Sequence, residues 1–301
     1  MQARSTGAVV GRFAPSPTGE LHFGSLLAAL GSFLSARAQN GEWLVRIENI
    51  DPPREVAGAG RRQLETLAEH GLESDRPPVW QIESTPRHEA VIQGLLDRGL
   101  AFHCGCTRAD LPASGIYPGT CREGLPPGRR PRSIRLRVEA DSDVEFLDAV
   151  QGRCRQSPGR ESGDFVIRRA DGLVAYQLAV VVDDILAGVT EVIRGSDLIE
   201  STSRQILVYR ALGLAPPRYG HLPLVIDNSG RKLSKSDGDD PVAAGRPAHT
   251  LRRALGCLGH PPPADLDRVA PLLDWGIEHW QEATVPRGPC VSSGDELIRD
   301  A

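Results

Sequence analysis

The sequence predicts an α/β fold built on a parallel sheet, and three features near its start indicate this. Ala8–Phe13 has the apolar character of a buried strand, and apolar residues at helical spacing predict a helix over Gly24–Gln39. Trp43–Ile47 is expected to form the next strand, because it is rich in β-type residues. Polar-faced helices are then predicted over residues 55–70 and 84–98. Strands that alternate with helices in this way favour parallel pairing through crossover helices.

The composition excludes several other classes of protein. Of 301 residues, 40% are hydrophobic and 25% charged, which is ordinary globular usage and argues against global disorder. No apolar run is long enough for a membrane-spanning helix, and the first residues lack the apolar segment of a signal peptide. Six cysteines are too few for a disulfide scaffold. We therefore expect a cytoplasmic protein without a membrane partner. The net charge of -4 neither requires nor excludes binding to nucleic acid.

The regular pattern is interrupted in the middle of the chain. Residues 103–164 are rich in Gly, Pro and Arg, with short strands such as Ile134–Val138, and are predicted to form an insertion. The α/β pattern resumes at Phe165 and continues through Tyr176–Val182, Val192–Arg194, a helix over 201–212 and a strand over Leu222–Ile226.

The remaining residues are expected to form a small second part. Helices are predicted over about 248–258 and 264–282, followed by a polar tail from about Arg287. This divides the chain into residues 1–237 and residues 238–301.

The first motif that indicates chemistry is the segment Arg12–Ser25. It combines a strand end, a proline-rich turn and a helix start, and ligands of open α/β sheets bind where strands end and helix N-termini hold anions. His22 could donate to a phosphate, and Gly24 would let a flat ring approach the backbone. An ordinary strand–loop–helix connection with an incidental histidine would look the same.

The second motif is defined by lysine usage. The chain contains 35 Lys and Arg residues, and the only lysines are Lys232 and Lys235, within the stretch Gly230–Ser236. Lysine is a compact point charge on a flexible stem, whereas arginine is a planar fork. Two ammonium groups in a glycine-flanked loop suit a triphosphate whose charge shifts during reaction. A solvated surface loop is the alternative.

Together the two motifs resemble the HIGH and KMSKS signatures of class I aminoacyl-tRNA synthetases. They stand here as His22–Ser25 and Lys232–Ser236, with Ser25 in place of the last histidine and Leu233 in place of methionine. Further segments follow in the order of the glutamyl/glutaminyl branch: Arg12–Gly19, Val45–Asp51, Tyr176–Asp184 and Val192–Leu198.

This resemblance implies a Rossmann-like catalytic domain over residues 1–237, a zinc-bearing insertion and a small C-terminal helical region. The residues after the lysine loop are too few for the anticodon-binding domain of a discriminating glutamyl-tRNA synthetase, so none is expected. The chain resembles the short glutamyl-queuosine tRNA(Asp) synthetase family. That family activates L-glutamate with ATP without needing tRNA, and transfers it to the queuosine base in the anticodon loop of tRNA(Asp). We expect a monomer.

The resemblance also implies roles for individual residues. His22, Lys232 and Lys235 would be catalytic, and ATP, accompanied by Mg²⁺, would be bound by His22, Gly24, Ser25 and Lys235. L-glutamate would be bound by Arg12, Ala14, Ser16, Glu48, Tyr176 and Arg194. Without the family context, Glu48 would be read as a surface ion pair and Tyr176 as a core aromatic. Asp183 and Asp184 lie in a matched segment, but no chemical role follows for them.

A third motif indicates a structural metal site. Cys104, Cys106 and Cys121 cluster in the insertion, and three thiolates need a fourth ligand to hold zinc tetrahedrally. The family implies Tyr117 as that ligand, while His103 and Asp110 are chemically plausible rivals; three free thiols are the alternative to a metal site. The other cysteines, Cys154, Cys257 and Cys290, are expected to be packing or surface thiols.

A run of arginines near the insertion is a weaker signal. It comprises Arg129, Arg130, Arg132, Arg135 and Arg137, and it fits tRNA phosphates and the exposed face of a strand equally well. Two alternative functions also remain at this point. One is a truncated glutamyl-tRNA synthetase that charges tRNA(Glu), and the other is a catalytically inactive paralogue that binds RNA.

Overall fold

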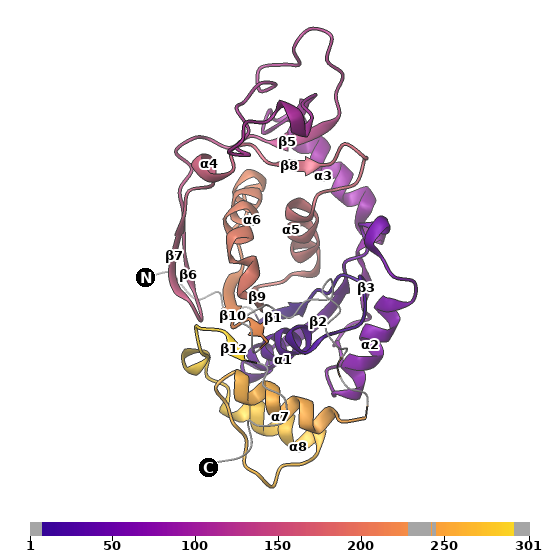
Figure 1. Ribbon diagram of the computed structural model, residues 1–301, viewed down its shortest axis with the longest axis vertical. Coiled ribbons are helices and arrows are strands. Elements are labelled where there is room, and N and C mark those ends of the chain that lie inside the picture. Colours follow the sequence, from indigo (N-terminus) through magenta and orange to yellow (C-terminus); the bar gives the residue numbers. More distant parts are fainter. Residues whose placement is uncertain (1–7, 228–241, 243–244, 292–301) are drawn as a thin grey trace.

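A computed structural model describes residues 8–227, 242 and 245–291, and it confirms the α/β fold (Figure 1). Strands β1 (Val10–Phe13), β2 (Glu42–Ile47) and β3 (Val79–Trp80) pair in parallel. Strands β9 (Glu191–Gly195) and β10 (Arg218–Leu222) form a second parallel pair. The two groups lie side by side, because the backbone N–H of Thr190 donates to the carbonyl of Val10 at 2.9 Å.

Helices cover both faces of these strands. On one face, α1 (Phe23–Ala38) packs in one apolar core with α7 (Pro247–Cys257) and α8 (Val269–His279). On the other face, the core joins α3 (Thr85–Asp97), α5 (Tyr176–Ala187) and α6 (Ile199–Leu212). In Figure 1, α7 and α8 lie at one end of the long axis, below α1. Among the described residues, no helix has the length and apolar character needed to cross a membrane.

The insertion builds a small antiparallel sheet at the opposite end of the molecule (Figure 1). Its strands are β4 (Ala101–Cys104), β5 (Ser133–Leu136) and β8 (Val166–Arg168), so flanking residues on both sides of the expected insertion take part. A hairpin of β6 (Val144–Asp148) and β7 (Gly152–Gln156) instead extends the sheet of β9 and β10, because Asp148 pairs with Tyr219 of β10.

Local chemistry explains where the element boundaries differ from the prediction. Helix α2 (Ala59–Glu69) starts later than expected, after Gly58 in the left-handed conformation at φ 73°. The predicted strand Leu222–Ile226 is divided between β10 and β11 (Val225–Ile226) around Pro223, which has no N–H to donate to a ladder. The remaining short elements are α4 (Pro158–Glu161), β12 (Cys290–Val291) and the 3-10 helices, of which Pro52–Arg54 matters below.

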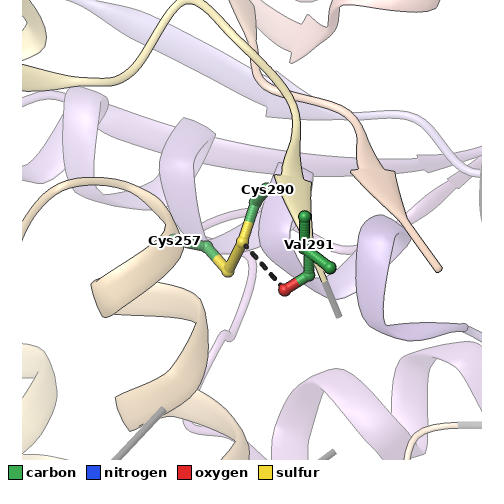
Figure 2. The surroundings of a disulfide bond; sticks show 3 residues. All are labelled: Cys257, Cys290 and Val291. Atoms are coloured by element: carbon green, nitrogen blue, oxygen red, sulfur yellow. Dashed lines mark hydrogen bonds between the residues drawn. A yellow bond between two sulfur atoms is a disulfide. The ribbon is translucent and has the colours of Figure 1, made fainter. Parts of the chain in front are cut away.

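The prediction that Cys257 and Cys290 are thiols is wrong. They form a disulfide with a Cα–Cα distance of 5.6 Å (Figure 2). The bridge ties the end of α7 to β12, which pairs in parallel with β11 and belongs to the segment expected to be a polar tail. Cys290 N–H also donates to the Leu224 carbonyl at 2.8 Å. The sequence could not predict this pairing, because the two cysteines are 33 residues apart and a disulfide depends on their distance in the folded structure.

Reduction of this disulfide is expected to destabilise the protein. Because the bridge closes a loop of 33 residues, its loss should lower the free energy of unfolding by about 4 kcal/mol. Thermal unfolding with and without a phosphine reductant measures the effect. A Cys257→Ser/Cys290→Ser double variant should unfold at the temperature of the reduced protein and show no response to the reductant. An identical unfolding temperature for reduced and oxidised protein would contradict the expectation.

Candidate active site

A cavity of about 600 Å³ opens where β1 and β9 end. The connections from these neighbouring strands leave in opposite directions, β1 toward α1 and β2, and β9 toward α6 and β10. Such a divergence opens a crevice at the carboxyl ends of the strands, where α/β proteins bind ligands. The structure brings together here eight of the expected site residues: Arg12, Ala14, Ser16, His22, Gly24, Ser25, Tyr176 and Arg194.

Two arginines give one wall of the cavity the capacity to hold carboxylates. Arg12 at the end of β1 and Arg194 at the end of β9 are each 4% exposed. Buried guanidinium groups suit bidentate pairing with carboxylates. Tyr176, the first residue of α5, completes this wall. Burial raises the pKa of Tyr176, and the charge of Glu48 adds to the rise while Arg194 and Arg12 oppose it, so the phenol stays protonated.

Arg12 is held by a carboxylate for which the sequence had suggested no role. Asp184 accepts from Arg12 Nε at 3.3 Å and from Arg46 Nη1 at 2.7 Å, and its side chain is 5% exposed. Burial would raise the pKa of Asp184, but the charges of both arginines and their hydrogen bonds outweigh burial and lower it. Asp184 is therefore ionised and sets the orientation of Arg12.

Asp183 lies farther from the cavity than the ion pairs of Asp184 with Arg12 and Arg46, and it has a structural set of partners. Its carboxylate contacts His88 Nε2 at 2.9 Å and accepts from Gln81 Nε2 at 2.7 Å, and all three side chains are buried. Asp183 does not line the cavity at β1 and β9. It anchors α5 to the segment that leads into α3.

Glu48 lies behind the cavity wall rather than on it. It is 8% exposed, does not line the cavity, and accepts from Arg46 Nη2 at 3.3 Å. Burial raises its pKa, and Arg46 and Arg12 oppose the rise. Since the charge of Glu48 influences Tyr176, the carboxylate is close enough to act on the cavity electrostatically.

The start of α1 forms another wall of the cavity. His22 is the N-cap residue, and its Nδ1 accepts from the backbone N–H of Ser25 at 3.3 Å. The Ser25 hydroxyl lies 3.0 Å from Nε2 of the same ring. A Cβ atom on Gly24 would lie 3.1 Å from the His22 ring and 3.7 Å from Val225 Cβ, so only glycine leaves this side open. The expected residues Lys232 and Lys235 lie outside the described residues.

The insertion brings three cysteines and a tyrosine into one buried cluster. The sulfur atoms of Cys104, Cys106 and Cys121 lie within 4.8 Å of one another, and the Tyr117 hydroxyl lies 3.4 Å from Cys104 Sγ and 3.9 Å from Cys106 Sγ. Cys106 and Cys121 sulfurs are 3.7 Å apart, close to the edge of about 3.8 Å that a tetrahedron with bonds of about 2.3 Å requires. The donor set therefore fits a closed structural metal site.

The electrostatics of the cluster also suit a metal. Burial opposes ionisation of Cys104, but hydrogen bonds, chiefly from Tyr117, lower its pKa to about 7. Burial and the neighbouring sulfurs raise the pKa of Cys106 to about 11. A divalent cation would favour the thiolate form of all three cysteines.

Neither rival ligand joins the cluster. His103 is exposed, and Asp110 bonds its carboxylate to Thr107 and Arg129. Arg135, one of the arginines considered for RNA, is buried instead: its guanidinium lies 4.0 Å from the Tyr117 ring centroid, and Nε lies 3.4 Å from Cys104 Sγ. For Arg135 the interpretation as an exposed RNA contact is therefore wrong.

A second hollow of about 930 Å³ lies between the cavity and the cysteine cluster and shares a lining residue with each. Arg54, in the 3-10 helix Pro52–Arg54, lines both hollows, and Cys106 lines the second one. Positive side chains dominate this groove: it contains Arg54, Arg108, Arg132, Arg135 and Arg169 against Asp51 and Asp171. We call it the arginine groove.

Known proteins with similar sequences belong to the family that the motifs resemble. Residues 8–114 and 124–263 match the family model of the catalytic domain of class I tRNA synthetases (E and Q). A glutamyl-Q tRNA(Asp) synthetase of Pseudomonas aeruginosa is 50% identical over 296 residues, which is 97% of this chain and 100% of the relative. One of Xanthomonas campestris pv. campestris is 52% identical over 291 residues, 96% of each chain.

The fold is also similar to that of a solved tRNA ligase structure. A glutamate tRNA ligase from Elizabethkingia meningosepticum, in complex with its amino acid, superposes with a TM-score of 0.81 at 26% identity. The match covers 95% of this chain and 67% of the ligase.

Proposed function

The chain belongs to the class I tRNA synthetases of the E and Q type, in the glutamyl-Q tRNA(Asp) synthetase family, and is a ligase of the aminoacyl-tRNA synthetase type; on that premise we propose its reaction. It activates L-glutamate with ATP without needing tRNA, and it transfers the glutamate to the queuosine base of tRNA(Asp). The observation that carries the proposal is the cavity at β1 and β9, where eight of the expected residues converge.

Glutamate recognition rests on the two buried arginines. The substrate has two carboxylates, and Arg12 and Arg194 offer one guanidinium each at the ends of neighbouring strands. Tyr176 packs against the amino acid, Ala14 and Ser16 contact it through the turn after β1, and Glu48 supplies negative charge for its ammonium group. Two cations balanced against one anion match the charges of glutamate.

Activation requires positioning rather than an enzyme nucleophile. A glutamate carboxylate oxygen attacks the α-phosphorus of ATP, a new P–O bond forms, and pyrophosphate leaves with the electron pair of the broken bond. His22, Gly24 and Ser25 receive the nucleotide at the start of α1. Lys232 and Lys235 follow β11 in the sequence, and Val225 of β11 lines the cavity. Lys235 stabilises the charge that develops on the phosphates, and Lys232 supports it. Mg²⁺ would accompany the phosphates of ATP.

The arginine groove supports a nucleic-acid acceptor. Arg108 and Arg132 in it are exposed, and even without the buried Arg135 four arginines stand against two carboxylates, so the groove favours phosphates. Arg54 connects the groove with the cavity where the glutamyl-adenylate forms. An anticodon loop in the groove would therefore reach the activated glutamate.

The insertion holds the groove in shape. Cys104, Cys106, Tyr117 and Cys121 would hold one zinc ion, which supplies a structural cross-link and takes no part in the reaction. The small apolar core around them contains few other large side chains, which makes the metal the main stabiliser of this part.

Transfer of labelled glutamate tests the proposal. We expect ATP–pyrophosphate exchange that depends on glutamate and proceeds without tRNA, and label on queuosine-containing tRNA(Asp) alone among that RNA, unmodified tRNA(Asp) and tRNA(Glu). A matched variant, Lys235→Ala, should lower exchange about 100- to 1,000-fold because one charge-stabilising donor is lost, while glutamate still binds.

The remaining outcomes separate the alternatives. Label on tRNA(Glu) alone would identify a truncated glutamyl-tRNA synthetase. Absence of exchange from zinc-loaded protein would favour an inactive RNA-binding paralogue.

A further inference from the structure

A line of buried polar side chains runs from the β6–β7 hairpin to the cavity. The Asp148 carboxylate lies 2.5 Å from His221 Nδ1, and Arg194 Nε donates to His221 Nε2 at 3.1 Å. Asp148, His221 and Arg194 are 2%, 0% and 4% exposed. Of these three, Arg194 alone lines the cavity. Polar groups buried this deeply need partners, so their arrangement is specific.

Hydrogen-bond chemistry determines where the proton of His221 resides. The Nε group of an arginine can only donate, so Nε2 of His221 must be the unprotonated, accepting nitrogen. Nδ1 then carries the proton and donates it to Asp148. The ring is neutral in this state, and burial, reinforced by the charge of Arg194, lowers the pKa of His221 although Asp148 opposes the effect.

Asp148 is held in place by the backbone around it. Its Oδ1 accepts from the N–H groups of Val150 at 3.0 Å, Gln151 at 2.8 Å and His221 at 3.0 Å. These bonds make the carboxylate a rigid anchor at the point where the hairpin joins β10. The anchor selects the tautomer of His221 that can accept from an arginine.

The result is an Arg194 side chain that is held at two of its three nitrogens. His221 holds Nε, and Thr202 Oγ1 accepts from Nη2 at 2.8 Å. Nη1 is buried and has no hydrogen-bond partner among the described residues. The guanidinium is thereby held in one orientation at the cavity wall, which Arg194 lines, and a guanidinium held in this way suits pairing with a carboxylate.

We propose that Asp148 and His221 are positioning residues for substrate recognition: they lock the Arg194 guanidinium at the cavity wall in the orientation that pairs with a carboxylate of the amino-acid substrate. The inference rests on the proposed glutamate activation, because it needs the cavity to bind an acidic amino acid. Neither residue contacts substrate itself, since neither lines the cavity.

Steady-state exchange kinetics test the inference. His221→Leu removes the acceptor of Arg194, so the KM for glutamate should rise about 10- to 100-fold, the loss expected for a hydrogen bond to a charged group, while the KM for ATP stays unchanged. Asp148→Asn should raise the glutamate KM similarly, because an amide donor to Nδ1 would place the ring proton on Nε2, against Arg194. His221→Gln, whose amide oxygen can occupy the place of Nε2, should restore most of the affinity.

Controls separate positioning from stability. His260 is also a buried histidine with several hydrogen bonds, but it lies in the C-terminal part, away from the cavity. His260→Leu should lower the unfolding temperature without changing the glutamate KM. Should His221→Leu fail to fold, Asp148→Asn measures the loss of affinity, and His221→Gln serves as the variant that retains it.

Two results would have different meanings. Equal glutamate KM values for wild type and Asp148→Asn, and for His221→Leu where that variant folds, would overturn the positioning role while leaving the proposed function intact. Absence of glutamate-dependent exchange from the wild-type protein would overturn the proposed function itself.

Discussion

Asp184→Asn is expected to lower the free energy of unfolding by about 3–5 kcal/mol, the cost of breaking a buried ion pair by removing one partner. Asp184 is 4% exposed and bonds to both Arg12 and Arg46, so the neutral amide leaves two buried guanidinium groups with less compensating charge. Chemical unfolding with urea measures the loss. The KM for glutamate should also rise, because Arg12 loses the carboxylate that orients it.

An exposed ion pair provides the matched control. Asp171 bonds to Arg169 at the surface, with side-chain exposures of 47% and 40%, and Asp171→Asn should change the free energy of unfolding by less than about 1 kcal/mol. Equal stability of the two variants would show that the Asp184 network contributes nothing beyond a surface pair.

The Asp184 network also makes a prediction about pH. Its folded-state pKa is lower than that of an unfolded aspartate, so the stabilisation is complete above the unfolded value. It is lost as the pH falls from there through the folded value. Asp184→Asn should therefore reduce the acid dependence of stability below about pH 4.

Loss of the metal site is the second large effect. Cys104→Ser is expected to abolish stoichiometric zinc and to unfold the insertion locally, because Cys104 and its neighbours form the centre of its small core. A structural zinc contributes folding free energy of about 10 kcal/mol or more in small zinc domains. Elemental analysis and hydrogen exchange of residues 104–125 measure the two consequences.

Two further variants define the ligand set. Tyr117→Phe keeps three thiolates and removes one oxygen, so zinc should still bind but with affinity lowered by at least about tenfold in chelator competition. Cys154→Ser changes a free cysteine outside the cluster and should retain one zinc per chain. Two results together would rule the site out. The wild-type protein would contain no zinc, and hydrogen exchange of its insertion would stay slow after treatment with a chelator.

Much of the site could be predicted because its signals are local in the sequence. His22, Gly24 and Ser25 follow one another across a single helix start, and Cys104, Cys106, Tyr117 and Cys121 lie within one short segment of the insertion. The helix over Gly24–Gln39 was predictable for a similar reason, since its apolar spacing reports burial directly.

The supporting network could not be predicted, because it depends on partners distant in the chain. Asp148 and His221 are 73 residues apart, and Arg12 and Asp184 are 172 apart. Neither pair carries a spacing rule, and a buried aspartate looks like a surface one in the sequence. Glu48 shows the converse: the motif identified the residue, but the fold placed it behind the cavity wall.

The sequence by itself determined the family, the α/β fold and the motif residues, because the residues that act together at a strand end or helix start are neighbours in the chain. Only the tertiary structure decided which charges neutralise one another, that Cys257 and Cys290 form a bridge, and that His221 and Thr202 hold the Arg194 guanidinium. The reason is physical: hydrogen bonds and ion pairs act over about 3–4 Å. Distances of that kind exist only after packing has brought distant segments together.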